Sequence, residues 1–184
     1  DGHQPVDLSL TALALEHLVM QRIVRLVRKA SLQCGADALG SGLADKDQHV
    51  DNNTLIDHAV PHCDSHELYK YVLDGNAVGA FAGRILVRKD AQKTTSEETN
   101  QNLLSTKTAR MYTQPMLEIY ADDVKCSHGS TVGQLSDKAL FYMRQRGIPL
   151  EEARLLLQAA FVYEVIDKIP LEPLRDRLHY LIEK

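Results

Sequence analysis

A thiol and an imidazole stand two residues apart at Cys126 and His128. Alternate residues of a β-strand point to the same face, so we expect the two side chains to lie together if this segment is a strand. Both groups ligate iron or zinc, and an imidazole beside a thiol is expected to lower the pKa of the thiol. The spacing therefore predicts metal or sulfur chemistry. The simpler interpretation is that Cys126 fills a core position and His128 makes a local hydrogen bond.

A second group of possible metal ligands consists of His58, His62 and His66, at intervals of four, with Cys63 among them. In a helix the three histidines would share one face. Pro61 and the strand-like surroundings disfavour a helix, and the spacing fits no usual zinc pattern. In a strand His58 and His62 would still share a face, but a structural role is the favoured interpretation.

Two adjacent carboxylates, Asp122 and Asp123, could act as a general acid and base, as clustered carboxylates do in β-helix enzymes that cleave polysaccharides. Neighbouring residues of a strand point to opposite faces, so a role in a turn is favoured. A carbohydrate-active enzyme is therefore the alternative function. The sequence contains no Gly-x-x-x-x-Gly-Lys phosphate loop, and we do not expect the chain to hydrolyse ATP itself.

The composition is that of a folded globular protein. The 184 residues are 44% hydrophobic and 25% charged, and the net charge of -4 offers no electrostatic basis for binding nucleic acid or an acidic membrane. Three cysteines without a Cys-x-x-Cys pair indicate neither a disulfide framework nor a four-thiolate metal site. The sequence has no apolar run of about 18 residues and no basic-then-apolar start, so we expect a cytoplasmic protein.

Short alternating apolar segments run from Val6 to about Leu135 and predict strands rather than long helices. Turn chemistry interrupts them at Asp51-Asn52-Asn53 and at Asp74-Gly75-Asn76. The Thr and Asn residues between 94 and 102 suit stacked polar corners. This pattern predicts a β-solenoid over residues 1–135, with strands near 54–60, 68–73, 77–87, 110–121 and 124–128.

Residues 136–184 have a helical pattern instead. Ser136 is placed to cap a first helix that ends near Gly147, and Glu151 and Glu152 suit the start of a second. Pro170 separates a third helix. Helices of this length are marginal alone, so we expect this C-terminal domain to pack on itself, on the strands or on another protein.

The segment 117–133, Leu-Glu-Ile-Tyr-Ala-Asp-Asp-Val-Lys-Cys-Ser-His-Gly-Ser-Thr-Val-Gly, resembles the SufB/SufD family of iron–sulfur cluster assembly proteins, and within it the SufD branch. Residues 49–54, 57–63 and 90–94 are also similar, and so are Gly83-Arg84-Ile85 and 144–148. The resemblance covers roughly residues 43–160. Met143 stands where SufB carries a cluster-ligand cysteine, which favours the SufD branch.

The resemblance implies a mainly β protein with α, a right-handed parallel β-helix followed by a C-terminal helical domain. It implies a non-catalytic scaffold that pairs with a SufB-like subunit through the β-helices and receives a SufC-like ATPase on the helices. Whether the chain forms a homodimer when SufB is absent is left open by the sequence. No permanently bound cofactor is implied, only a transient iron–sulfur cluster at the SufB interface. Because family members are longer, we expect the N-terminal side of the solenoid to be truncated or incompletely covered.

By the same resemblance, His128 is the residue that faces the SufB cysteine, and Cys126 is its neighbour in the motif. His128 would therefore be a shared ligand to transient iron or a cluster. The residues assigned to partner docking lie in the helical region: Leu140, Arg144, Arg146, Leu171 and Leu174.

Overall fold

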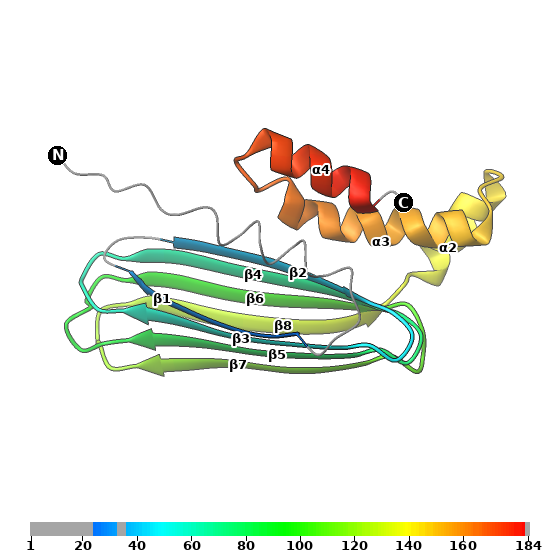
Figure 1. The fold of residues 1–184 in the computed structure, drawn as a ribbon. Coiled ribbons are helices and arrows are strands. Elements are labelled where there is room, and N and C mark those ends of the chain that lie inside the picture. Colours follow the sequence, from blue (N-terminus) through cyan, green and yellow to red (C-terminus); the bar gives the residue numbers. More distant parts are fainter. Residues whose placement is uncertain (1–23, 33–35, 183–184) are drawn as a thin grey trace.

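The computed structural model describes residues 24–32 and 36–182, in which eight strands are followed by three helices (Figure 1). The predicted alternation from Val6 up to Ile23 and the thiol Cys34 lie outside these residues. The strands are β1 (Val24–Leu32), β2 (Ala36–Ala44), β3 (His49–His58), β4 (Asp64–Leu73), β5 (Val78–Val87), β6 (Thr95–Leu104), β7 (Arg110–Ile119) and β8 (Lys125–Gln134).

The strands form two four-stranded parallel sheets, ordered β1-β3-β5-β7 and β2-β4-β6-β8. The chain alternates between the sheets, so each strand pairs with the strand one full turn later. Asp64 pairs with Thr95, and Thr95 pairs with Lys125. Figure 1 shows the two sheets as facing layers. The predicted parallel β-helix is confirmed.

Two polar segments that the sequence placed in turns or corners are strands. Residues 95–102 belong to β6, and Asp51-Asn52-Asn53 belong to β3. The interior tolerates their amides because those amides are hydrogen-bonded: Asn100 Nδ2 donates to the Tyr69 carbonyl at 3.3 Å, and Asn102 Nδ2 donates to the Thr131 carbonyl at 2.9 Å. A buried amide with partners costs little, so polar composition alone misleads here.

Two other turn predictions are confirmed. Asp74-Gly75-Asn76 joins β4 to β5, and Gly75 adopts the left-handed φ of 61° that glycine accepts without strain. The Thr106 hydroxyl, one turn later, donates to the Gly75 carbonyl at 2.7 Å. Asp122 and Asp123 lie in the turn between β7 and β8. Successive turns of the solenoid therefore stack upon one another as the strands do.

Inward-facing side chains fill the space between the sheets in two apolar clusters. The first is built around aromatic rings, with Tyr69 and Phe81 centroids 4.9 Å apart. The second is aliphatic and lies toward the opposite end of the strands; its buried members are Ile56, Ile85, Val87, Ala91 and Ala121. Polar side chains occupy the interior between and beside these clusters.

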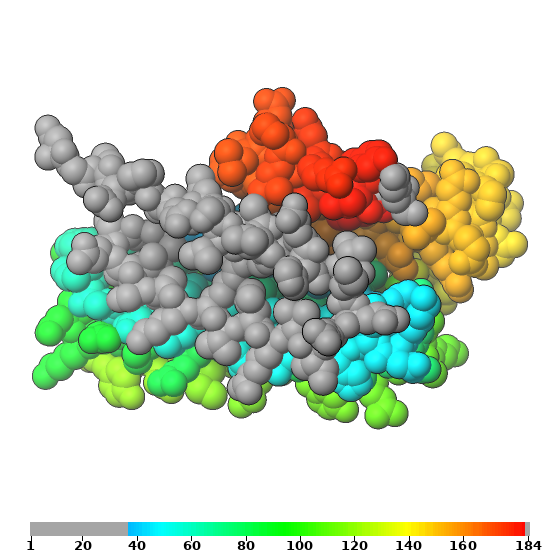
Figure 2. Space-filling view, in the orientation of Figure 1, coloured from blue at the N-terminus to red at the C-terminus, as the bar shows by residue number. Residues whose placement is uncertain are grey.

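The C-terminal helices are α2 (Asp137–Gln145), α3 (Leu150–Ile166) and α4 (Glu172–Ile182). As predicted, the Ser136 hydroxyl caps α2 by accepting the Ala139 N–H at 3.3 Å, and Gly147 follows the helix with φ of 86°. The helices form a layer of their own above the strands (Figure 2). No helix in the described part of the chain is both long and apolar enough to cross a lipid bilayer.

The helical layer packs on the outer face of the β2-β4-β6-β8 sheet. Val72 of β4 is buried against Val162, Ile166 and Leu178 of α3 and α4. Beside them the Lys70 ammonium, on a side chain only 3% exposed, pairs with Glu164 and lies 4.4 Å from the centre of the Phe161 ring. The ion pair lowers the pKa of Glu164. Apolar burial and one cation thus join the two layers.

Replacing Val162 with Ala is expected to lower the free energy of unfolding by about 2 kcal/mol, because two buried methyl groups are lost and a cavity is left. Leu155→Ala on the same helix is the matched control, since Leu155 is 63% exposed, and it should change the free energy by less than about 0.5 kcal/mol. Urea denaturation of the parent protein and of the two variants measures both changes in the free energy of unfolding. Equal effects would contradict the packing.

Candidate functional site

Cys126 and His128 lie on β8, and the pairing of β8 with β6 sets the direction of their side chains. Cys126 pairs with Ser96, and His128 pairs with Glu98. Ser96 and Glu98 are buried inside the solenoid, and paired residues of parallel strands share a face. Cys126 also packs against the aliphatic cluster. The two side chains therefore belong to the inward face, side by side, as the i, i+2 spacing predicts.

The inward face is accessible here because the described strands end at β7 and β8. In the described residues β7 pairs only with β5, and β8 only with β6. His128 is exposed and Cys126 is half-buried, although their equivalents one turn earlier are closed off. We call this end, formed by β7 and β8, the open end. Large apolar side chains are exposed along it: Tyr112, Met116, Ile119, Tyr120 and Val132.

Two buried carboxyl groups, Glu67 and Glu98, line up behind His128. Glu67 of β4 pairs with Glu98 of β6, which pairs with His128 of β8, so the three residues form one row across the sheet. Glu67 is 1% exposed and Glu98 0%. Burial and the charge of Glu67 raise the pKa of Glu98 to about 8. Burial raises the pKa of Glu67 to about 7, with Thr54 acting in the opposite direction.

The carboxyl group of Glu98 occupies space that only a glycine on the facing strand leaves free. A Cβ atom at Gly83 would lie 1.8 Å from Glu98 Oε1. The backbone of β5 therefore approaches the carboxyl directly. Neither carboxylate oxygen of Glu98 has a hydrogen-bond partner in the described part of the chain.

A second polar row links the interior to Cys126. His58 Nε2 lies 3.0 Å from Ser65 Oγ, and Ser65 Oγ lies 2.7 Å from Ser96 Oγ, the neighbour of Cys126 in the ladder. Burial lowers the pKa of His58 and raises the pKa of the Cys126 thiol. The expectation that an imidazole lowers the thiol pKa is therefore wrong.

Comparisons with known proteins identify the family to which this chain belongs. The family described as "SUF system FeS cluster assembly, SufBD core domain" matches residues 19–161. The chain belongs to the SufBD family. It is 41% identical over 135 residues to a SufBD family protein of Synechocystis, covering 73% of this chain and 30% of that protein. It is 40% identical over 133 residues to the iron–sulfur cluster assembly protein SufD of Escherichia coli, covering 72% and 31%.

This SufBD chain thus spans about a third of the length of the curated relatives it matches. A third relative, a chloroplastic protein of Arabidopsis thaliana, is 40% identical over 126 residues, which is 67% of this chain and 26% of that protein. The matched region includes every described strand and most of α3. Both polar rows therefore lie within the SufBD core domain.

The histidine-rich segment does not come together in this SufBD fold. His58 ends β3 and is buried, whereas His62 lies in the following corner with φ of 61°. His66 is exposed on β4 and contacts Asp37 at 3.4 Å. The expectation that His58 and His62 share a strand face is wrong, because the strand ends between them. Cys63 is buried, and its thiol donates to the Val60 carbonyl.

Asp122 and Asp123 are exposed in the turn between β7 and β8, and the backbone of Asp123 makes hydrogen bonds that hold this turn in place. Its N–H donates to Gln92 Oε1 at 2.8 Å, and its carbonyl accepts the Lys93 N–H at 2.6 Å. The carboxylates are therefore free to face solvent while the backbone joins two turns of the solenoid.

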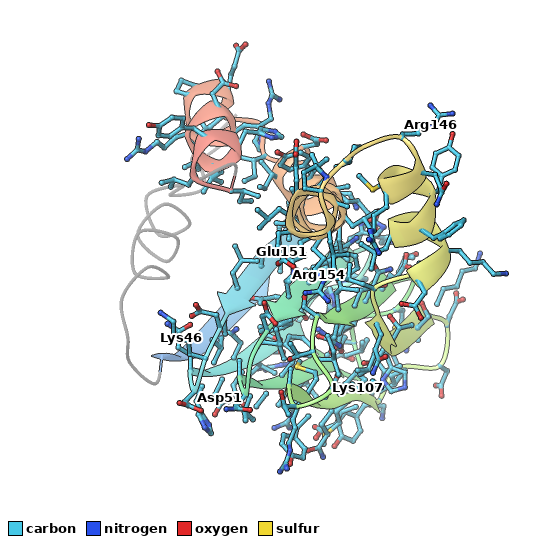
Figure 3. The ribbon with its side chains drawn as sticks, turned by 90° about the vertical axis from the view of Figure 1, so that its right-hand side faces the viewer. Lys46, Asp51, Lys107, Arg146, Glu151 and Arg154 are labelled. Carbon is cyan, nitrogen blue, oxygen red and sulfur yellow. The ribbon has the colours of Figure 1, made fainter. Side chains whose placement is uncertain are left out.

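The residues assigned to partner docking differ in their exposure. Arg144 and Arg146 are exposed, Leu140 is half-buried and Leu171 is 42% exposed. The Arg146 guanidinium lies 4.5 Å from the centre of the Tyr142 ring, and Figure 3 shows Arg146 on the side of the helices away from the strands. Glu151 and Arg154, by contrast, lie between the helices and the strands in that view.

Leu174 differs from the other assigned residues, because it packs against the buried cluster of Val72 and Val162. The exposed apolar side chains that accompany Arg144 and Arg146 are Phe141 and Tyr142 on α2, with Leu155 and Leu156 on α3. The sequence did not identify these residues as exposed, because helical periodicity alone does not say which apolar face of a helix packs on the sheet.

Sequence reasoning also missed Glu67 and Glu98. Their signal is the two-residue alternation of Ser96, Glu98, Asn100 and Asn102, which marks the inward face once Thr95–Leu104 is known to be a strand.

The stability of this SufBD chain is expected to fall as the pH rises from about 4.5 to about 8. The Glu98 carboxyl is protonated in the folded interior up to about pH 8, whereas it ionises near 4.5 when unfolded. The stabilisation is full below the unfolded pKa and is lost as the pH passes the folded one, by up to about 1.4 kcal/mol per pH unit for one proton.

Glu98→Gln should reduce this dependence, because the amide does not titrate; what remains comes from Glu67, whose pKa burial raises to about 7. Exposed Glu97→Gln, on the opposite face of the same strand, should leave it unchanged. Urea unfolding at pH 5 and pH 8 compares the three proteins. A Glu98→Gln variant with the pH slope of the parent protein would show that Glu98 does not carry the effect.

Proposed function

We propose that this chain is the core of a SufD-type scaffold subunit, on which iron and sulfide are gathered during iron–sulfur cluster assembly. The observation that carries the proposal is the placement of His128 and Cys126, side by side on the inward face of β8, which is accessible at the open end. Membership of the SufBD family supports a role in iron–sulfur cluster assembly. The accessibility of the inward face at β7 and β8 supports the open end as the place where iron and sulfide are gathered. The chain acts by holding ligands and partners in place, and has no catalytic step of its own.

The open end suits a second solenoid as its partner. β7 and β8 present unpaired backbone edges in the described residues, with exposed apolar side chains beside them. Such edges pair readily with strands of another chain, which would continue both sheets across the interface. We assign this position to a SufB-type subunit. When that subunit is absent, a second copy of this chain takes the same position.

Iron and the nascent cluster are cargo at this interface. The His128 imidazole supplies a nitrogen ligand, and Cys126 supplies a thiol two residues away. Burial raises the pKa of the Cys126 thiol and so disfavours the thiolate that would bind a metal, and we therefore assign His128 as the first ligand. A cysteine of the partner completes the site, and the cluster leaves with its acceptor rather than staying on this chain.

The helices suit the attachment of a SufC-type ATPase. Phe141, Tyr142 and Arg144 of α2 and Arg146 directly after it are exposed. The other side of the helical layer is held on β4 through Val72 and the Lys70–Glu164 pair. Movement of the ATPase would therefore reach the solenoid through α3.

Replacing His128 with Ala is expected to reduce cluster assembly at least tenfold, because a ligand is lost while the fold around an exposed side chain is kept. The control is His66→Ala, an exposed histidine on the outer face of β4. The measurement is anaerobic reconstitution of the full-length protein with its SufB- and SufC-type partners, followed by the visible absorption of the cluster. Normal assembly by His128→Ala in an intact complex would remove the proposed role.

Two surface variants should separate the two partners. Met116→Lys places a charge at the open end and should weaken pairing with the SufB-type subunit at least tenfold, while Phe141→Glu on α2 should weaken binding of the SufC-type ATPase similarly. Each variant is the control for the other in pull-downs of the full-length protein. Loss of both partners from either variant, or of neither, contradicts the assignment of separate surfaces.

A further inference from the structure

We propose that Glu98 is a second iron ligand of this chain, so that a carboxylate and an imidazole from neighbouring strands bind one ferrous ion at the open end. The inference rests on the proposed function, because it places the ion at His128. It adds a residue that neither the family resemblance nor the motif around Cys126 contains.

The ladder places the two side chains within reach of one ion. Glu98 and His128 are paired residues of β6 and β8 on the inward face. Neighbouring strands are about 4.8 Å apart, and metal–oxygen and metal–nitrogen bonds of about 2.0–2.2 Å allow donors on such neighbours to meet at a single ion. Oxygen and imidazole nitrogen are both ligands that suit ferrous iron.

Glu98 and its neighbour Glu67 differ from the buried serine and asparagine residues around them, and of the two only Glu98 pairs with a residue at the open end. Ser65, Ser96, Asn100 and Asn102 all make hydrogen bonds that explain why they are tolerated in the interior. Glu98 is 0% exposed, and neither of its carboxylate oxygens has a partner in the described residues. A carboxyl group buried without a partner destabilises the fold. A function in binding a cation accounts for its presence.

The surroundings hold the Glu98 carboxyl in place. It lies against the backbone of Gly83, where a Cβ atom would come within 1.8 Å of Oε1, and Glu67 lies on its far side in the row. The remaining neighbour in the row is His128, at the open end. No group of three or more possible metal ligands occurs in the described part of the chain. For the ferrous ion this chain therefore contributes Glu98 and His128, without Cys126, and the partner across the open end contributes the rest.

The test uses the full-length protein in complex with its SufB- and SufC-type partners, under anaerobic conditions. Fe(II) affinity is measured by equilibrium dialysis, and Co(II) is added separately so that its visible d–d absorption reports the ligand set. Glu98→Gln keeps the size of the side chain and removes the carboxylate. Glu97→Gln, exposed on the other face of β6, is the matched control.

Glu98→Gln is expected to raise the Fe(II) dissociation constant at least tenfold and to change the Co(II) spectrum, whereas Glu97→Gln should match the parent protein. Glu98→Asp keeps the charge but draws the carboxylate back by one methylene group. It should weaken Fe(II) binding to an intermediate degree, and it serves as the second variant if the amide impairs folding. Circular dichroism and co-purification with the partners confirm that each variant is folded.

His128→Ala separates this inference from the proposed function. If His128→Ala weakens Fe(II) binding and both Glu98 variants bind like the parent protein, the carboxylate role is overturned and the proposed function stands. If His128→Ala binds Fe(II) and Co(II) normally, the ion is elsewhere and both are overturned. Weakening by His128→Ala and by Glu98→Gln, with normal binding by Glu97→Gln, supports the pair.

Discussion

In-register stacking of parallel strands is the constraint on which the rest of this structure depends. Each inward side chain of β4 lies beside its counterpart on β6, 31 residues later, and then beside one on β8 after a further 30. Rows of side chains therefore run across the sheet, and the last member of each row, such as the half-buried Cys126 or the exposed His128, lies at the open end. The chemistry of the open end is decided by the rows that lead to it.

Two of these rows are polar, and they differ in how the fold accommodates them. The row from His58 through Ser65 and Ser96 to Cys126 begins with a linked set of hydrogen bonds, so it adds to the stability of the interior. The row of Glu67, Glu98 and His128 lacks such partners at both Glu67 and Glu98, and burial raises the pKa of both carboxyls. The row of Glu67, Glu98 and His128 therefore destabilises the isolated fold. A function is the reason to expect such residues in the interior.

The helical layer covers part of the β2-β4-β6-β8 sheet, and so limits how much of that sheet is free to contact other proteins. Val72 and Lys70 of β4 are covered by α3, which removes part of the outer face of the β2-β4-β6-β8 sheet from solvent. The open end and the outer side of α2 remain exposed. The proposed function assigns these two surfaces to separate partners, and α3 connects the two positions.

The sequence alone determined the short strands, the capped helices after Ser136 and the motif around Cys126 and His128, because alternation, capping residues and a specific motif are local signals. It placed β6 in the corners, since Thr and Asn residues favour turns unless neighbouring strands satisfy their side chains. Only the tertiary structure decided that Glu98 stands beside His128, 30 residues away along the chain. Register between strands one turn apart depends on the lengths of the turns and on packing between the sheets, which no local pattern specifies.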